Sequence, residues 1–193
     1  DIVDFTATPM LRGAVTAVNG TPAEALAPRG SEALFLLSGD VPLTYRVQLP
    51  TTSRLVVGAW WPPDYSGAPL VSLHQSLRSG LGLAVGDELV FDIFGDSISA
   101  TVANFRDYSW QGGIDFLIAF SPGVMEAYPA TLLGAVKAAP GREDAVERTL
   151  AASLPFVRFV AIGETLDQIT QALGQLSLAA SLVGGLAVGN GLL

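Results

Sequence analysis

The sequence predicts an α+β fold that is rich in strands and runs into the beginning of a transmembrane helix. Apolar and polar residues alternate on both sides of a tight turn near residue 95, as in a β-hairpin with one buried face. A strand–helix–strand pattern follows over residues 131–162. Residues 168–193 then contain no ionisable side chain and consist mainly of Leu, Ala, Val and Gly.

The composition of the 193 residues excludes several kinds of partner and site. Half of the residues are apolar and 15% are charged, and the mean hydropathy of +0.46 is high for a soluble domain. The net charge of −8 would repel phosphate backbones, so nucleic acid is not an expected partner. The chain has no cysteine, which excludes disulfides and thiolate metal sites.

The first half of the chain reads as short strands separated by turns. Val15 and Val18, followed by Asn19-Gly20, predict a strand over 11–18 that ends in a turn. Residues 72–79, with Leu residues four apart, predict a short helix that stops at Gly80. Three further apolar segments are expected to be strands: 33–37, 43–49 and 54–61.

The clearest local prediction is a hairpin, in which strands 88–94 and 97–104 flank Gly95-Asp96. The continuously apolar residues 116–120 predict a buried strand. The second half then gives a strand, a helix and a strand over three segments: 131–137, 143–153 and 157–162. Acidic residues in the first turn of the helix complement its dipole, and Val146, Leu150 and Leu154 form its apolar stripe.

The C-terminal segment indicates a membrane location. Residues 176–193 would form a helix about 27 Å long, close to the roughly 30 Å thickness of bilayer hydrocarbon. Gly184, Gly185 and Gly189 would allow another membrane helix to approach closely. The alternative is a buried helix of a soluble core, where each glycine costs about 1 kcal/mol if it is exposed to water. We expect a stalk helix from residue 164 that continues into the first part of a transmembrane helix at about 176–193.

Several ordered segments carry a family resemblance. SLAASLVGGLAVGN at 177–190 looks like a helix that follows an extracytoplasmic domain, and LGLAVGD at 81–87 precedes the hairpin. These features resemble the FtsX-like and MacB-like permeases of ABC transporters. Three further stretches look like the second extracytoplasmic domain of the long YbbP-type permeases: PMLRG (9–13) with AVNG (17–20), LVVGAWW (55–61), and FLIAFSPGV (116–124) with YPAT (128–131).

The resemblance implies an architecture and a role. Residues 1–50 and 115–163 would form a ferredoxin-like, porter-type βαβ lobe, the MacB-like periplasmic core, with a small barrel-like β-rich lobe inserted at 51–114. Such a domain lies on the periplasmic side of the cell membrane and binds no ATP or other cofactor. It relays motion from a cytoplasmic ATP-binding subunit to the export, or the extraction from the membrane, of an apolar or amphipathic substrate.

The sequence contains no convincing catalytic or metal site. The single histidine, His74, cannot form a His-rich metal centre and is expected to be a surface or packing residue. Gly80, Gly82 and Gly86 fit neither a dinucleotide fingerprint nor a phosphate loop, so they are assigned to turns. Four carboxylates are scattered without the spacing of an acid/base pair: Asp92, Asp96, Asp107 and Asp115. An enzyme is therefore not expected.

Five aromatic residues are the candidate binding residues: Trp60, Trp61, Tyr65, Tyr108 and Trp110. One interpretation is ordinary packing of the inserted lobe. The other is an apolar patch that docks a lipid-like substrate or an accessory protein, since aromatic side chains anchor such surfaces. At the level of the whole chain the alternatives are a transporter component and a membrane-anchored binding or sensor domain without an ATPase.

Overall fold

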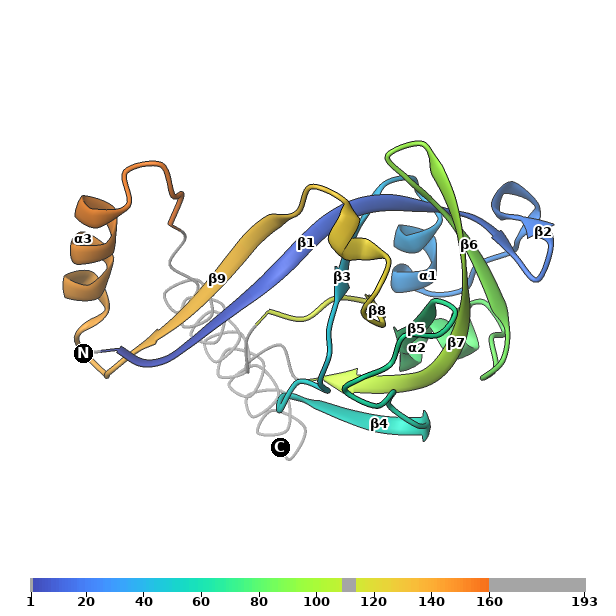
Figure 1. Ribbon diagram of the computed structural model, residues 1–193, viewed down its shortest axis with the longest axis horizontal. Helices are drawn as coiled ribbons and strands as arrows, with labels where there is room; N and C mark the ends of the chain where they lie inside the picture. Colours follow the sequence, from blue (N-terminus) through green and yellow to red (C-terminus); the bar gives the residue numbers. More distant parts are fainter. Residues whose placement is uncertain (1, 109–113, 160–193) are drawn as a thin grey trace, which may run out of the picture. The chain divides into compact units, whose positions relative to one another are not determined.

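The computed structural model describes residues 2–108 and 114–159, and this part of the chain is a mixed, strand-rich α/β structure (Figure 1). The expectation of a fold that combines helices with a large share of strands is thereby confirmed. The chain divides into two compact units: Ile2–Lys137, and Ala138–Leu193 together with Asp1. No helix in the described part of the chain is long and apolar enough to cross a bilayer. The stalk and transmembrane helix expected over 164–193 lie outside the described residues.

The described part of the first unit is built from nine strands and two short α-helices. In chain order they are β1 (Ile2–Val18), β2 (Thr21–Pro22), α1 (Ser31–Leu36), β3 (Val41–Tyr45), β4 (Ser53–Gly58), β5 (Leu70–His74), α2 (Gln75–Gly80), β6 (Glu88–Ile93), β7 (Asp96–Tyr108), β8 (Ile118–Phe120) and β9 (Thr131–Ala138). Single turns of 3-10 helix lie at Ala23–Ala25 and Met125–Ala127. In the second unit α3 (Glu143–Ser153) has the bounds that its acidic first turn and apolar stripe predict.

Six of the strands close into a barrel. Following the pairings from β1 to β3, β8, β5, β7 and β6 leads back to β1. The β3–β8 and β5–β7 pairs are parallel and the others are antiparallel. Closure leaves these six strands without an open edge along the ring. Around the ring the three strands from the flanking segments (β1, β3 and β8) are neighbours, and so are the three strands from 51–114 (β5, β7 and β6). One hydrophobic cluster fills the barrel that they form together.

The β6–β7 hairpin shows how the sequence pattern builds the core. Leu89, Phe91 and Ile93 of β6 are fully buried, and Ile98 and its alternate neighbours on β7 face the same interior. This one-sided burial confirms the prediction from alternation. The turn, however, consists of Phe94 and Gly95, which both have positive φ (55° and 91°), and Ile93 is paired with Asp96. Such φ values are those of a type I′ turn, so the predicted Gly95-Asp96 turn was one residue too late.

Two elements differ in type from the prediction. Residues 31–36 form helix α1, whereas a strand was expected over 33–37. The short apolar run fits either element by its pattern alone, and Ala33 and Leu36, three residues apart, face the core from one side of the helix. Residues 72–74 continue strand β5, and the helix predicted from residue 72 begins only at Gln75. Pairing of β5 with β7 and β8 on its two sides outweighs the helical spacing of the leucines.

The last strand of the predicted strand–helix–strand pattern, expected over 157–162, is absent from the part of this segment that the structure describes. Residues 157–159 have no strand assignment, and residues 160–162 lie outside the described part. The first strand of that pattern, predicted over 131–137, is confirmed as β9.

Gly58 is a position where the backbone requires glycine, and its replacement gives a stability prediction. It ends β4 with φ of 84°, and an added Cβ would overlap the carbonyl oxygen of Ala103 and lie 2.8 Å from Cα of Asn104. Gly58→Ala is therefore expected to lower the free energy of unfolding by about 2–3 kcal/mol, from left-handed strain plus overlap. Urea denaturation measures this loss.

The matched control for Gly58→Ala is Gly95→Ala. Gly95 also has positive φ, but a Cβ there meets nothing within 4 Å, so only the conformational cost of about 1–2 kcal/mol is expected. Equal losses for the two variants would show that the overlap of the added Cβ with β7 at Gly58 costs no stability beyond the left-handed backbone strain.

Candidate functional site

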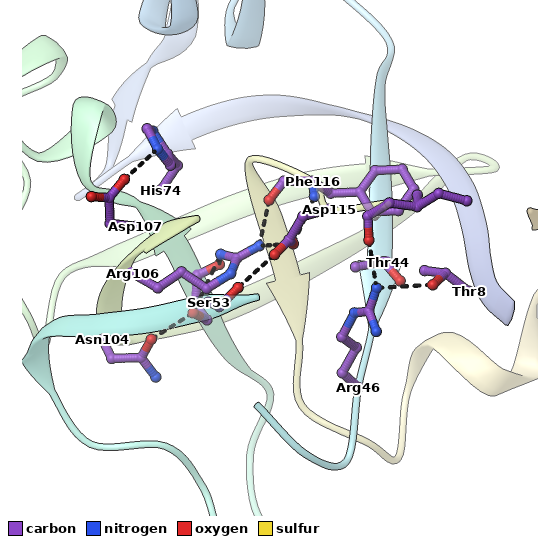
Figure 2. A network of polar contacts seen from close by, with 12 residues as sticks. Thr8, Thr44, Arg46, Ser53, His74, Asn104, Arg106, Asp107, Asp115 and Phe116 are labelled. Carbon is purple, nitrogen blue, oxygen red and sulfur yellow. Dashed lines mark hydrogen bonds and ion pairs between the residues drawn. The ribbon is translucent and has the colours of Figure 1, made fainter. Parts of the chain in front are cut away.

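A network of buried polar side chains lies where β4, β5 and β7 meet the segment that leads into β8, and Figure 2 shows it from close by. At its centre Arg106 is completely buried, and its Nη2 lies 2.9 Å from Oδ1 of Asp115. The guanidinium also donates to the carbonyl oxygens of Ser72 (3.0 Å) and Phe116. An ion pair buried to this degree persists only when further hydrogen bonds satisfy both partners.

The carboxylate of Asp115 is held from the other side as well. Ser53 Oγ donates to its Oδ2 at 2.6 Å, and the backbone N–H of Phe116 donates to Oδ1 at 2.8 Å. Ser72 Oγ donates to Oδ1 of the buried Asn104, whose amide donates to the carbonyl of Ala59. The network therefore fixes three neighbouring strands and the entry to β8 in one arrangement.

A second arginine joins the start of the barrel to the same segment. Arg46, just after β3, donates from Nη2 to Thr8 Oγ1 (2.9 Å) and to the carbonyl of Ile114 (3.0 Å). Burial lowers the pKa of Arg46 from its usual value, and the carboxylate of Asp115 partly opposes this. The Nε atoms of Arg46 and Arg106 are buried without a hydrogen-bond partner in the described part of the chain.

His74 lies at the margin of the network. Its Nε2 is 3.5 Å from Oδ1 of Asp107, whose other oxygen lies 3.4 Å from the exposed Arg54. The imidazole packs against the ring of Tyr108 with centroids 4.7 Å apart. Burial lowers the pKa of His74, although Asp107 acts in the opposite direction. Burial also raises the pKa of Tyr108, so the phenol stays protonated at physiological pH.

Ser76, His74 and Asp107 form a chain of contacts that superficially resembles a catalytic triad. Ser76 Oγ lies 2.7 Å from His74 Nδ1, but that nitrogen also accepts the backbone N–H of Ser76 at 3.3 Å. His74 is thus the N-cap residue of α2, and the serine belongs to the same turn. The contacts are explained by helix capping, which agrees with the packing role expected for this histidine.

The capping geometry makes a prediction about pH. An imidazole whose pKa is lowered on folding binds fewer protons folded than unfolded, so stability falls as pH drops through the ordinary value of 6.5. His74→Asn keeps a side-chain cap without a titrating group. We expect the loss of unfolding free energy between pH 7 and pH 5 to be smaller in this variant than in the parent. Denaturation at both pH values measures the difference, and identical losses would contradict the prediction.

The five candidate aromatic residues do not form one cluster. Trp60 and Trp61 lie together, with ring centroids 4.1 Å apart. Both are tied to the segment after β3: Trp61 Nε1 donates to the carbonyl of Arg46 (2.8 Å) and Trp60 Nε1 to that of Val47 (3.0 Å).

The remaining aromatic candidates lie elsewhere. Tyr65 donates its hydroxyl hydrogen to Ala68 within its own loop. Tyr108 is buried beside His74, and Trp110 lies outside the described residues. Trp61 is only 4% exposed, so of the tryptophan pair only Trp60 offers a partly exposed ring to a partner.

The other candidate residues are accounted for locally. Gly82 and Gly86 have positive φ, as turn residues do. Gly80 ends α2 where a Cβ would meet Ala33 at 2.7 Å, so it permits close packing with α1. The carboxylates have separate partners: Asp92 the N–H of Gly95, Asp96 the hydroxyl of Tyr128, Asp107 His74 with Arg54, and Asp115 Arg106. No group of three metal-ligating side chains occurs among the residues that the structure describes.

Sequence reasoning did not find the centre of the network, although a signal was present. On β7 the apolar residues Ile98, Ala100 and Val102 alternate toward the interior. The same alternation continues through Asn104 and Arg106, which are therefore polar residues at interior positions. A charged residue at a position that the alternation places in the interior predicts a partner of opposite charge, which here is Asp115.

Comparison with known proteins gives one informative match. Over 162 residues the chain is 28% identical to a protein of Escherichia coli (strain K12) described as "Uncharacterized ABC transporter permease YbbP". The matched region is 83% of this chain but 19% of that protein, so the chain spans about a fifth of the length of the relative it matches. No protein-family model and no solved structure matches the chain. The similarity supports a domain related to part of an ABC transporter permease.

Proposed function

We propose that this chain is an extracytoplasmic domain of an ABC transporter permease, which relays motion driven by a cytoplasmic ATP-binding subunit to an apolar or amphipathic substrate. The observation that carries the proposal is the similarity to a permease over 83% of the chain. The charge-free residues 168–193, long enough for a bilayer helix, are consistent with it. The residues that resemble the second domain of YbbP-type permeases make that domain the most specific form of the proposal.

The internal construction suits a part that transmits motion rather than one that performs chemistry. The buried ion pair of Arg106 and Asp115 joins strands that are far apart in sequence, and its groups already have partners within the protein. Such groups are poorly placed for acid/base catalysis but hold a barrel rigid. In the proposed architecture residues 51–114 are the inserted lobe of the domain, and 1–50 with 115–163 are its porter-type lobe.

Within this function Trp60 is the residue we assign to substrate or accessory-protein contact. Its ring is partly exposed and is anchored by the hydrogen bond to Val47. Tryptophan held in this way provides a rigid apolar contact. The candidates are therefore a lipid-like molecule or an accessory protein that presents an apolar surface.

The test uses the complete permease that carries this domain. It is purified in detergent with its candidate ATP-binding subunit, and ATP hydrolysis is measured for each protein and for the mixture. A stable complex whose turnover requires both proteins would support the proposal. A subunit variant that binds ATP but cannot hydrolyse it is the control for contaminating ATPase.

The competing function is a membrane-anchored binding or sensor domain without an ATPase. It predicts a full-length protein with one or two hydrophobic spans that purifies without an ATP-binding subunit. That result would overturn the transporter proposal.

A further inference from the structure

The N-terminal part of β1 and strand β9 form a two-stranded ribbon (Figure 1), and several of its apolar side chains are exposed. The ribbon consists of residues 2–7 and 131–137. Its most exposed apolar residues are Val3 (63%), Phe5 (61%) and Leu132 (74%), and Val136 is exposed to 37%. Large apolar side chains exposed together in this way indicate a contact surface.

These four side chains lie on one face of the ribbon. A Cβ built at Gly134 would lie 3.3 Å from Cε2 of Phe5. The Phe5 side chain and the Cβ position of Gly134 are therefore on the same face of the ribbon. Side chains alternate along a strand, which places Leu132 and Val136 on the face of Gly134 and Val3 on the face of Phe5. This face, which we call the apolar face, contains no polar side chain among the residues named.

The opposite face has a different character. By the same alternation it carries four polar or charged residues, Asp4, Thr6, Thr131 and Lys137, beside the apolar Ile2 (50% exposed), Leu133 and Ala135. The charged and polar side chains of the ribbon thus lie on this mixed face, whereas the apolar face carries none.

We propose that the apolar face of the ribbon lies on the surface of a lipid bilayer. The beginning of β1 and the end of β9 lie at the same end of the ribbon (Figure 1). From that end thirty residues, 138–167, lead to the charge-free segment 168–193. A bilayer that receives this segment keeps the ribbon close to its surface at a high effective concentration. The inference rests on the proposed function only in that both place the chain at a membrane.

The chemistry of the ribbon specifies how it would contact lipid. The strands satisfy each other's backbone groups along their shared edge, whereas the groups on the outer edges still need water. The ribbon therefore suits the boundary between headgroups and acyl chains rather than the hydrocarbon centre. The apolar face is uncharged and the chain is acidic overall, so contact should not depend on anionic lipid.

The absence of native cysteine allows a direct test by spin labelling. Single variants Val3→Cys and Val136→Cys label the apolar face, and Thr6→Cys and Thr131→Cys label the opposite face. The 193-residue chain is reconstituted in phosphatidylcholine vesicles, and collisions of each label with oxygen and with a water-soluble nickel complex are measured. We expect the ratio of oxygen to nickel accessibility to be several-fold higher at positions 3 and 136 than at 6 and 131.

A matched pair of substitutions tests the cause. With the label at position 136, Phe5→Asp should lower the ratio to that of the opposite face, whereas Thr6→Asp should leave it unchanged. Equal nickel accessibility on both faces would overturn the proposal, as it would place the apolar face in water. Protection of positions 3 and 136 from both oxygen and nickel would also overturn it, because protein would then cover the face.

The labels also distinguish this inference from the proposed function. Measuring label accessibility needs no ATP-binding subunit. Labels exposed to lipid in a protein that has no coupled ATPase would contradict the transporter proposal and support the ribbon inference. Labels exposed to water in a protein whose ATPase is coupled to the permease would contradict the ribbon inference and leave the transporter proposal intact.

Discussion

Replacing Arg106 by methionine is expected to lower the free energy of unfolding by about 3–5 kcal/mol, because the buried carboxylate of Asp115 loses its charged partner. Part of the loss comes from the carbonyl oxygens of Ser72 and Phe116, which the guanidinium also satisfies. Denaturant unfolding followed by circular dichroism measures the change.

A double variant separates the ion pair from its surroundings. Arg106→Met combined with Asp115→Leu removes both charges, and such replacements of a buried pair are often close to neutral. We therefore expect the double variant to be more stable than Arg106→Met alone. Arg54→Met is the surface control, since Arg54 pairs with Asp107 in an exposed position and should contribute less than about 1 kcal/mol. A loss of that size at Arg106 would contradict the assigned role of the network.

Replacing Trp61 by alanine is the second change with a large expected effect. Trp61 is buried, packs on Trp60 and donates to the carbonyl of Arg46. The loss of this volume should lower the free energy of unfolding by about 3–5 kcal/mol, with a further contribution from the unpaired carbonyl.

Trp60→Ala is the matched comparison, because Trp60 has the same side chain as Trp61 and also donates to a backbone carbonyl, but is more exposed. We expect a clearly smaller loss of stability there. Under the proposed function, Trp60→Ala in the complete permease should lower substrate-dependent ATP turnover while the domain stays folded. Full stability of Trp61→Ala together with lost turnover would mean that Trp61, too, is a contact residue and not a packing residue.

The sequence predicted those parts of the fold that depend on local pattern. Alternation identified the β6–β7 hairpin and its buried face, and the acidic first turn with an apolar stripe identified α3. It assigned 33–37 to a strand because a five-residue apolar run fits both kinds of element. Local pattern could not reveal the parallel pairings of β3 with β8 and β5 with β7, since these join segments more than twenty-five residues apart.

The candidate site was less predictable for the same reason. Arg106 and Asp115 are close in sequence, but their pairing depends on strands β4, β5 and β7 meeting at one place. The aromatic residues were chosen by type and neighbourhood in the sequence. Side-chain direction then divides them, because Trp61 and Tyr108 point into the protein and Trp60 remains partly exposed.

Strand β1 has a mechanical consequence, because it belongs to both the ribbon and the barrel. It is a single strand of 17 residues, about 56 Å of extended chain, with one register irregularity between Val15 and Ala17. Within the barrel it is bonded to β3 through residues 11–13 and to β6 through residues 14–18. Tension along β1 would load these perpendicular hydrogen bonds together, in shear, whereas a sideways force would peel them one after another. A displacement at the ribbon therefore reaches the barrel along a single strand, because no loop separates the two parts of β1.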